Sequence, residues 1–142
     1  TPTEGDWDYD EGVIQNDSCS IGSLILGGKV YGDGTFGLAM TGTDTFTILP
    51  ANETDPFECA LSGSDISCAA RGFFALDLST YGLNGSVAAV STVEGTLVDA
   101  DNMTGTQYVS ADCTGADCAT AEAYLGASFP CTLDVDFTGT KQ

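Results

Sequence analysis

The sequence contains no histidine and only three basic residues, against 21 acidic ones. Without histidine the chain offers no Ser-His-Asp or Cys-His catalytic group, and no zinc or haem site that depends on histidine ligands. The formal net charge of −18 repels phosphate backbones and anionic lipid headgroups. We therefore expect no nucleic acid and no anionic membrane surface among the partners of this protein.

Long hydrophobic runs are also missing, since no apolar stretch approaches the roughly 18 residues that a membrane-spanning helix needs. The chain has no P-loop, no glycine-rich dinucleotide motif and no Gly-x-Ser-x-Gly pattern. Acidic residues are so numerous that carboxylate pairs at a glycosidase-like separation arise by chance, and nothing marks one of them as desolvated. We expect a protein that is not an enzyme and has no cofactor, with a carboxylate-based hydrolase as the alternative.

The composition that remains is typical of an exported β protein. Six cysteines, an even number, accompany 18 glycines and many threonines in 142 residues. This length suits one domain, so we expect a single disulfide-stabilised domain over residues 1–142. The chain begins at Thr1 without an initiator methionine, which we interpret as a mature form after removal of a signal or anchor segment. The expected location is extracytoplasmic: secreted, periplasmic or surface-anchored.

Apolar and polar residues alternate in short runs between Gly, Thr and Asp, which predicts antiparallel strands. We expect nine strands, near residues 7–14, 35–40, 45–49, 57–61, 66–70, 73–78, 86–98, 103–111 and 132–138. The clearest inward-facing sets are Phe36, Leu38 and Met40; Phe46 and Ile48; and Leu133, Val135 and Phe137. Residues 21–26 are either a strand or a loop.

One segment departs from the alternating pattern. Residues 116–125 are rich in alanine, with Asp117 placed as an N-cap and Gly126 just beyond the end, which predicts a short helix. Eight or nine strands with one helix before the last strand predict an antiparallel β-barrel, because closure removes exposed strand edges. A β-sandwich is the alternative.

Gly5, Asp6 and Trp7 resemble the G-x-W start of lipocalin-type barrels, and a late helix followed by a closing strand is similar to lipocalin topology. The resemblance implies a barrel whose interior is filled by side chains or holds one small ligand.

A second resemblance rests on the segments DSCSIG, DGTFGL, FECALSGSDISCAAR, NMTGTQYVSADCTGADCA and FPCTLDVDFTGT. They are similar to a group of uncharacterised secreted or lipid-anchored, cysteine-containing β domains of Gram-negative bacteria. That similarity implies an extracytoplasmic location and the same framework of six cysteines, but no activity.

The cysteine spacing predicts one disulfide directly. Cys59 and Cys68 flank a turn at residues 62–65, so that their sulfur atoms face each other across a hairpin. The other four cysteines can then pair in three ways. We favour the pairs Cys113–Cys118 and Cys19–Cys131.

Acidic residues gather near the N-terminus, where the first of them alternate with Trp7 and Tyr9: they are Asp6, Asp8, Asp10, Glu11 and Asp17. The pattern resembles a calcium loop, but Gly12 comes one place late for an EF-hand turn. We favour a strand with its aromatic side chains inside and its carboxylates in water, and we expect no metal site.

The candidate ligand-binding residues are Trp7, Tyr9, Tyr108 and Arg71. Trp and Tyr combine apolar area with a polar group, so these three aromatics are expected at a barrel mouth, with ordinary core packing as the alternative. Arg71 either pairs with a neighbouring carboxylate, which we favour, or holds an anionic ligand group.

We therefore expect a non-enzymatic extracytoplasmic barrel that binds a small, partly apolar ligand or is displayed on the cell surface. The alternative is a structural subunit of a fibre or coat that self-assembles by strand pairing. A lumen lined by aromatic residues would favour binding, and an open sheet edge would favour assembly.

Overall fold

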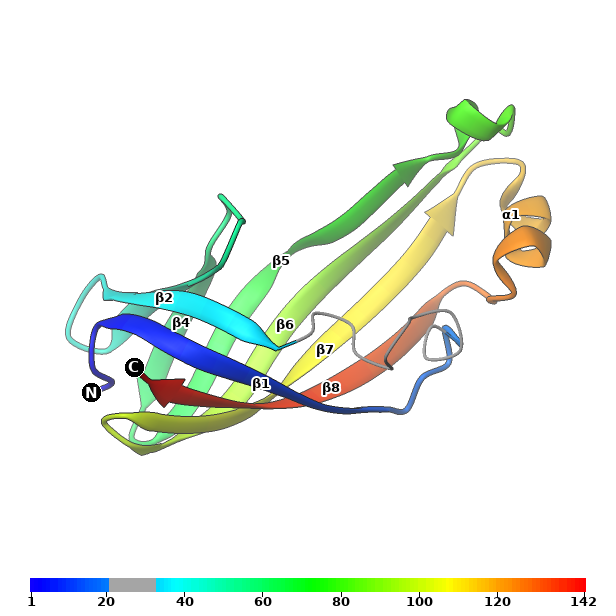
Figure 1. The fold of residues 1–142 in the computed structure, drawn as a ribbon. Helices are drawn as coiled ribbons and strands as arrows, with labels where there is room; N and C mark the ends of the chain where they lie inside the picture. The colour runs from blue at the N-terminus through cyan, green and yellow to red at the C-terminus, as the bar shows by residue number, and fades with distance from the viewer. Residues whose placement is uncertain (21–32) are drawn as a thin grey trace.

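The structure, a computed structural model, describes residues 1–20 and 33–142. Within these residues eight antiparallel strands close into a barrel in their sequence order (Figure 1). The strands are β1 (Gly5–Gln15), β2 (Gly34–Met40), β3 (Thr45–Pro50), β4 (Phe57–Ser62), β5 (Asp65–Asp77), β6 (Ser86–Asp99), β7 (Asn102–Thr114) and β8 (Cys131–Lys141). The predicted all-β barrel is thereby confirmed in place of the sandwich.

Two short helices complete the described elements: the 3-10 helix η2 (Leu78–Tyr81) and the α-helix α1 (Cys118–Leu125). The helix α1 precedes the last strand, as the sequence predicted. The segment 21–26, expected to be a strand or a loop, lies outside the described residues. No helix of the described chain is long and apolar enough to cross a membrane.

The prediction of two strands at 66–70 and 73–78 was wrong, because β5 runs through both as one strand. Its pairing with β6 shifts register between Cys68 and Arg71, and again between Gly72 and Phe74. Such irregularities insert unpaired residues and change the phase of the inward-facing side chains. The alternation of apolar and polar residues is therefore interrupted inside β5, as it would be at the end of a strand.

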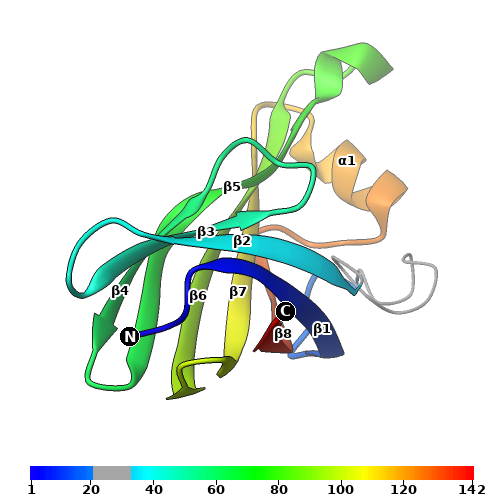
Figure 2. The same ribbon diagram turned by 60° about the vertical axis from the view of Figure 1, so that its left-hand side comes forward.

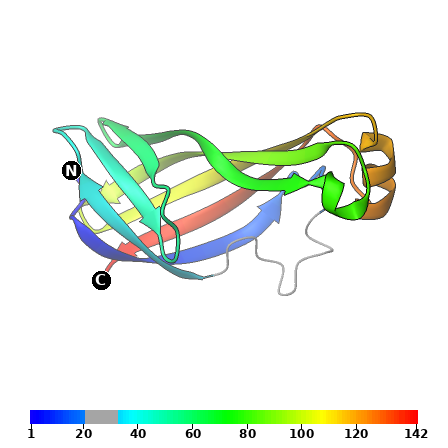
Figure 3. The ribbon, with the colours of Figure 1, turned by 90° about the horizontal axis from the view of Figure 1, so that it is seen from above.

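Strand length gives the barrel two different ends. Strands β2, β3 and β4 have six or seven residues, whereas β5, β6 and β7 have 13 or 14. The short strands thus cover only one half of the long ones (Figures 1 and 2). We call the half that the short strands cover the closed end. Both chain termini lie there, and η2 and α1 lie at the opposite end, the far end (Figure 3).

The core follows the predicted alternation. The inward sets on β2, β3 and β8 are buried, with Met40 partly buried against the same cluster. Between them on β8, Asp134 and Asp136 are only half-exposed. They accept hydrogen bonds from Asn16 and from Thr106 at 2.8 and 2.7 Å, so the outer barrel face carries its own polar cross-links.

The acidic N-terminal strand holds one exception to the prediction. Asp6, Asp8 and Asp10 are exposed and Trp7 is buried, but Glu11 is only 6% exposed. Between Trp7 and Glu11, before the register shift that follows Glu11, odd-numbered positions of β1 face the interior, so Glu11 follows Trp7 and Tyr9 inward. The expectation that all these carboxylates face water was therefore wrong for Glu11.

Helix α1 is capped differently from the expectation. Asp117 occupies the N-cap position, but its Oδ2 accepts a hydrogen bond from the Asn84 backbone N–H at 2.7 Å and does not cap α1. Gly126 ends the helix at a φ of 69°, in the left-handed region that suits glycine, and its N–H donates to the Glu122 carbonyl at 2.9 Å. Asp117 thus ties α1 to the turn that follows η2.

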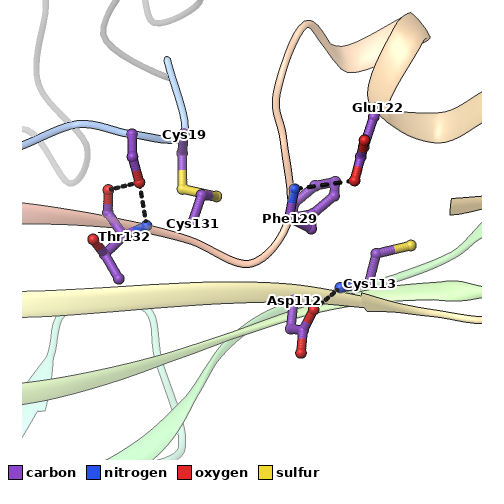
Figure 4. The surroundings of a disulfide bond; sticks show 8 residues. Cys19, Asp112, Cys113, Glu122, Phe129, Cys131 and Thr132 are labelled. Carbon is purple, nitrogen blue, oxygen red and sulfur yellow. Dashed lines mark hydrogen bonds between the residues drawn. A yellow bond between two sulfur atoms is a disulfide. The ribbon is translucent and has the colours of Figure 1, made fainter. Parts of the chain in front are cut away.

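Three disulfides join the described cysteines in the arrangement that the spacing favoured. Cys59–Cys68 bridges facing positions of β4 and β5, and Cys113–Cys118 links β7 to α1. Cys19–Cys131 ties the chain after β1 to the start of β8 (Figure 4). Beside it, the Ser18 N–H donates to the Thr132 carbonyl at 2.9 Å. The disulfide and this backbone hydrogen bond therefore join the same two segments.

Candidate functional site

A cavity of about 220 Å³ opens inside the barrel where the short strands end, and we call it the mouth cavity. Its apolar wall consists of side chains that are at most 8% exposed and come from five strands: Phe36, Ile48, Phe57, Val93 and Phe137. Residues 33–35 and 50–53 form its rim. Because each of these strands contributes a single residue, the alternating pattern builds the wall without any local motif.

Two polar side chains lie among these apolar ones. The Gln107 Nε2 donates a hydrogen bond to the Tyr9 hydroxyl at 3.1 Å, and both residues line the cavity. Gln107 is 6% exposed, and its Oε1 has no hydrogen-bond partner within the described residues. A buried acceptor left unsatisfied costs about 1–3 kcal/mol. The cavity thus contains one polar atom for which the described part of the chain supplies no partner.

Sequence reasoning missed Gln107. The signal was its position, because Met103, Gln107 and Val109 share the inward face of β7. The polar residues that alternate with this set face outward, whereas Gln107 occupies an inward position. A single glutamine at such a position indicates a polar side chain in the barrel interior.

Tyr9 is held in place by aromatic packing. Its ring stacks on that of Phe137, with centroids 5.4 Å apart and an interplanar angle of 28°. Phe137 lies opposite Gly105 in the pairing of β7 with β8. A Cβ atom at Gly105 would come within 2.7 Å of the Phe137 ring, so the glycine leaves the space that this ring occupies.

Arg71 forms the structural pairing that the sequence favoured. Its guanidinium pairs with the Glu53 carboxylate, donates to the Asp55 carbonyl and lies 4.1 Å from the centre of the Phe57 ring. These contacts fasten the connection between β3 and β4 to the start of β4 and to β5. Arg71 is not among the residues that line the mouth cavity.

Trp7 and Tyr108 were expected at the mouth and lie elsewhere. Trp7 is fully buried, stacks on Phe36 with centroids 5.9 Å apart, and donates from Nε1 to the Thr3 carbonyl at 2.9 Å. It therefore belongs to the core at the closed end. Tyr108 is 39% exposed because it neighbours the inward-facing Gln107 and so points outward. Of the four candidates, Tyr9 alone lines the cavity.

A larger cavity of about 470 Å³ lies at the far end, between η2 and α1, and we call it the far-end cleft. Leu76, Leu78 and Leu83 form its floor, while Tyr81 and Tyr124 beside it are 69% and 83% exposed. None of the buried polar atoms that lack a partner in the described chain belongs to this cleft. Because a ligand site combines apolar walls with a few placed polar groups, the mouth cavity is the better candidate.

The carboxylates with shifted pKa values lie outside both cavities. The pKa of Asp77 is lowered because its carboxylate accepts a hydrogen bond from the Ser79 backbone N–H at 2.9 Å. The pKa of Asp99 is lowered by the backbone N–H of Asp101, at 2.8 Å. Hydrogen bonds within turns thus lower the pKa of both carboxyl groups, whereas a catalytic acid at neutral pH needs a raised pKa.

The remaining site chemistry is sparse. Over residues 1–20 and 33–142, no group of three or more acidic or cysteine side chains is arranged to hold a metal ion. No family model, curated protein or solved structure matches this chain. The two resemblances therefore stay predictions.

Proposed function

We propose that this protein is a non-enzymatic, extracytoplasmic barrel that binds one small, partly apolar ligand in the mouth cavity. The observation that carries the proposal is the cavity itself, in which five buried apolar side chains surround the pair formed by Tyr9 and Gln107. Three disulfides support the location, since disulfides persist in oxidising compartments. The protein would be secreted, periplasmic or anchored at a surface.

Volume limits the ligand. An apolar cavity of about 150 Å³ holds a molecule the size of benzene, whereas sites for drug-sized ligands occupy about 300–1,000 Å³. At about 220 Å³ the mouth cavity suits one ring or a short branched chain, and it is too small for a lipid. Asp33 and Glu53 on the rim and a net charge of −18 disfavour anions.

Toluene is the direct probe of this proposal. In protein with labelled Ile, Leu and Val methyl groups, toluene should shift the NMR signals of Ile48 and Val93 saturably. Val93→Phe fills the cavity and should abolish the response. Val98→Phe is the matched control, since Val98 lies on the same strand, is 62% exposed and does not line the cavity.

Two results would contradict ligand binding in the mouth cavity. One is the absence of any saturable shift up to the solubility limit of toluene. The other is a set of shifts confined to Leu76 and Leu125, which would place the probe in the far-end cleft.

One observation favours a second function, assembly by strand pairing. Strand β5 pairs with β4 only over Asp65–Cys68, so among the described strands its remaining residues pair with β6 alone. Phe74 lies in this part of β5 and is 50% exposed. An edge of this kind can take a strand from another copy of the chain.

Sedimentation velocity tests the assembly function. If β5 pairs between copies, the wild-type protein should form oligomers at micromolar concentration, and Phe74→Lys should dissociate them, because lysine on an edge strand opposes pairing. Val90→Lys, at a residue 43% exposed on the neighbouring β6, is the control. A monomeric wild-type protein up to millimolar concentration would remove this function.

A further inference from the structure

We infer that the mouth cavity selects ligands that carry an N–H or O–H donor, which binds to Oε1 of Gln107. This inference rests on the proposed function, and it names the chemistry that the site recognises. Apolar walls discriminate weakly between molecules of one size, whereas a buried polar atom rejects a ligand that leaves it unpaired.

The orientation of the Gln107 amide identifies the missing partner as a donor. A glutamine side chain has one acceptor oxygen and two N–H donors on its nitrogen. Here Nε2 is the atom bonded to the Tyr9 hydroxyl, which leaves Oε1 as the unpaired atom. The residues opposite Gln107 on β6 and β8 are Val93 and Val135, whose side chains have no donor.

The acceptor is also held in position before a ligand arrives. Tyr9 fixes the amide through its hydroxyl, and the stacking of Tyr9 on Phe137 fixes the tyrosine. A site that is already ordered loses little conformational entropy on binding. Gln107 therefore acts as a specificity-determining residue rather than as a flexible polar contact.

Size and charge complete the description of the ligand class. A single ring or short branched chain with one hydroxyl or amino group fits a volume of about 220 Å³. The net charge of −18 favours the neutral or cationic forms of such molecules over carboxylates. Phenol is the simplest probe with these properties, and toluene is its donor-free counterpart of equal size.

The experiment compares the binding of two ligands to two proteins, in the manner of a double-mutant cycle. The difference in hydrophobicity between the ligands affects both proteins equally and therefore cancels. Dissociation constants for phenol and toluene are measured by methyl NMR on the wild-type protein and on Gln107→Met. The ratio of the toluene constant to the phenol constant should fall about 3- to 10-fold in the variant, as expected for one buried hydrogen bond. Gln15→Met, at an exposed glutamine outside the cavity, should leave the ratio unchanged.

Anisole tests the direction of the hydrogen bond, because its methyl group removes the donor and keeps an acceptor oxygen. Anisole should behave like toluene in both proteins. If Gln107→Met does not fold, Tyr9→Phe replaces it, since loss of the hydroxyl frees the amide and should reduce the preference for phenol.

The outcomes separate this inference from the proposed function. If toluene and phenol bind but the ratio is the same in both proteins, or if anisole gains as much from Gln107 as phenol does, donor selection is wrong and the cavity remains a binding site. If none of the three probes binds, both the inference and the proposed function fall.

Discussion

The Gln107 amide and the Tyr9 hydroxyl lie 3.1 Å apart, although 98 positions separate them in the sequence. Gln107 is on β7 and Tyr9 is on β1, and β8 lies between these strands in the sheet. Strands β1 and β7 are not hydrogen-bonded neighbours, so the two side chains meet inside the barrel, across the inner face of β8, where Phe137 stacks on Tyr9. This contact places a polar pair on the inside of a wall that is otherwise apolar.

Gly105→Ala should disturb this arrangement. The new Cβ would lie 2.7 Å from the Phe137 ring and 2.9 Å from the Glu94 carbonyl. Crowding of this kind typically costs about 1–3 kcal/mol, so the free energy of unfolding in urea should fall by that amount and toluene should bind more weakly. Gly37→Ala is the control, since nothing lies within 4 Å of a Cβ there. Equal stability of the two variants would show that Phe137 does not depend on Gly105.

The disulfides should differ in their contribution to stability. Cys19–Cys131 spans 112 positions and Cys59–Cys68 spans nine. Restriction of the unfolded chain predicts about 4.8 kcal/mol for the longer loop and about 2.7 kcal/mol for the shorter one. Paired Cys→Ala variants, unfolded in urea, should therefore rank in this order. The opposite order would mean that native packing around each bridge outweighs loop closure.

Salt should stabilise the protein, because a net charge of −18 on a chain of 14.5 kDa repels itself. Repulsion between exposed charges is screened over about 10 Å at 0.1 M salt. The melting temperature should rise between low salt and half-molar NaCl. A double variant, Asp10→Asn with Glu58→Gln, should show a smaller rise. A wild-type melting temperature independent of NaCl would show that charge repulsion does not limit the stability of the fold.

Asp77 should contribute to stability in a way that depends on pH. Its pKa in the folded protein is lowered from 3.8 by the hydrogen bond from Ser79, so the contribution is present above the unfolded pKa and is lost as pH falls through the folded pKa. Asp77→Asn keeps an acceptor but no charge, so the wild type should be the more stable near pH 6 and lose this advantage below about pH 4. A difference that does not change with pH would contradict the role of the carboxylate.

Much of the architecture could be predicted because the alternation of apolar and polar residues along a strand indicates which of its faces is buried. The alternation at Phe36 and Leu38, or at Leu133 and Val135, assigns each side chain to the interior without knowledge of its neighbours. The Cys59–Cys68 bridge follows from a short hairpin. Both are local signals.

The mouth cavity could not be predicted in this way, since its wall combines single residues from strands far apart in the sequence. Aromatic character suggested Trp7 and Tyr108, but the height of a residue along a tilted strand and the parity of its position decide where it lies. Parity alone could have indicated Gln107 and Glu11, because both occupy inward positions where the pattern otherwise requires apolar side chains.

A crystal structure of the wild-type protein soaked with phenol would show whether the mouth cavity holds a small ligand. We expect one phenol ring between Phe57 and Phe137, with its hydroxyl within about 2.7–3.2 Å of Gln107 Oε1. A mouth cavity that holds only water at saturating phenol, or that is closed by its own side chains, would contradict the claim that this barrel binds a small ligand there.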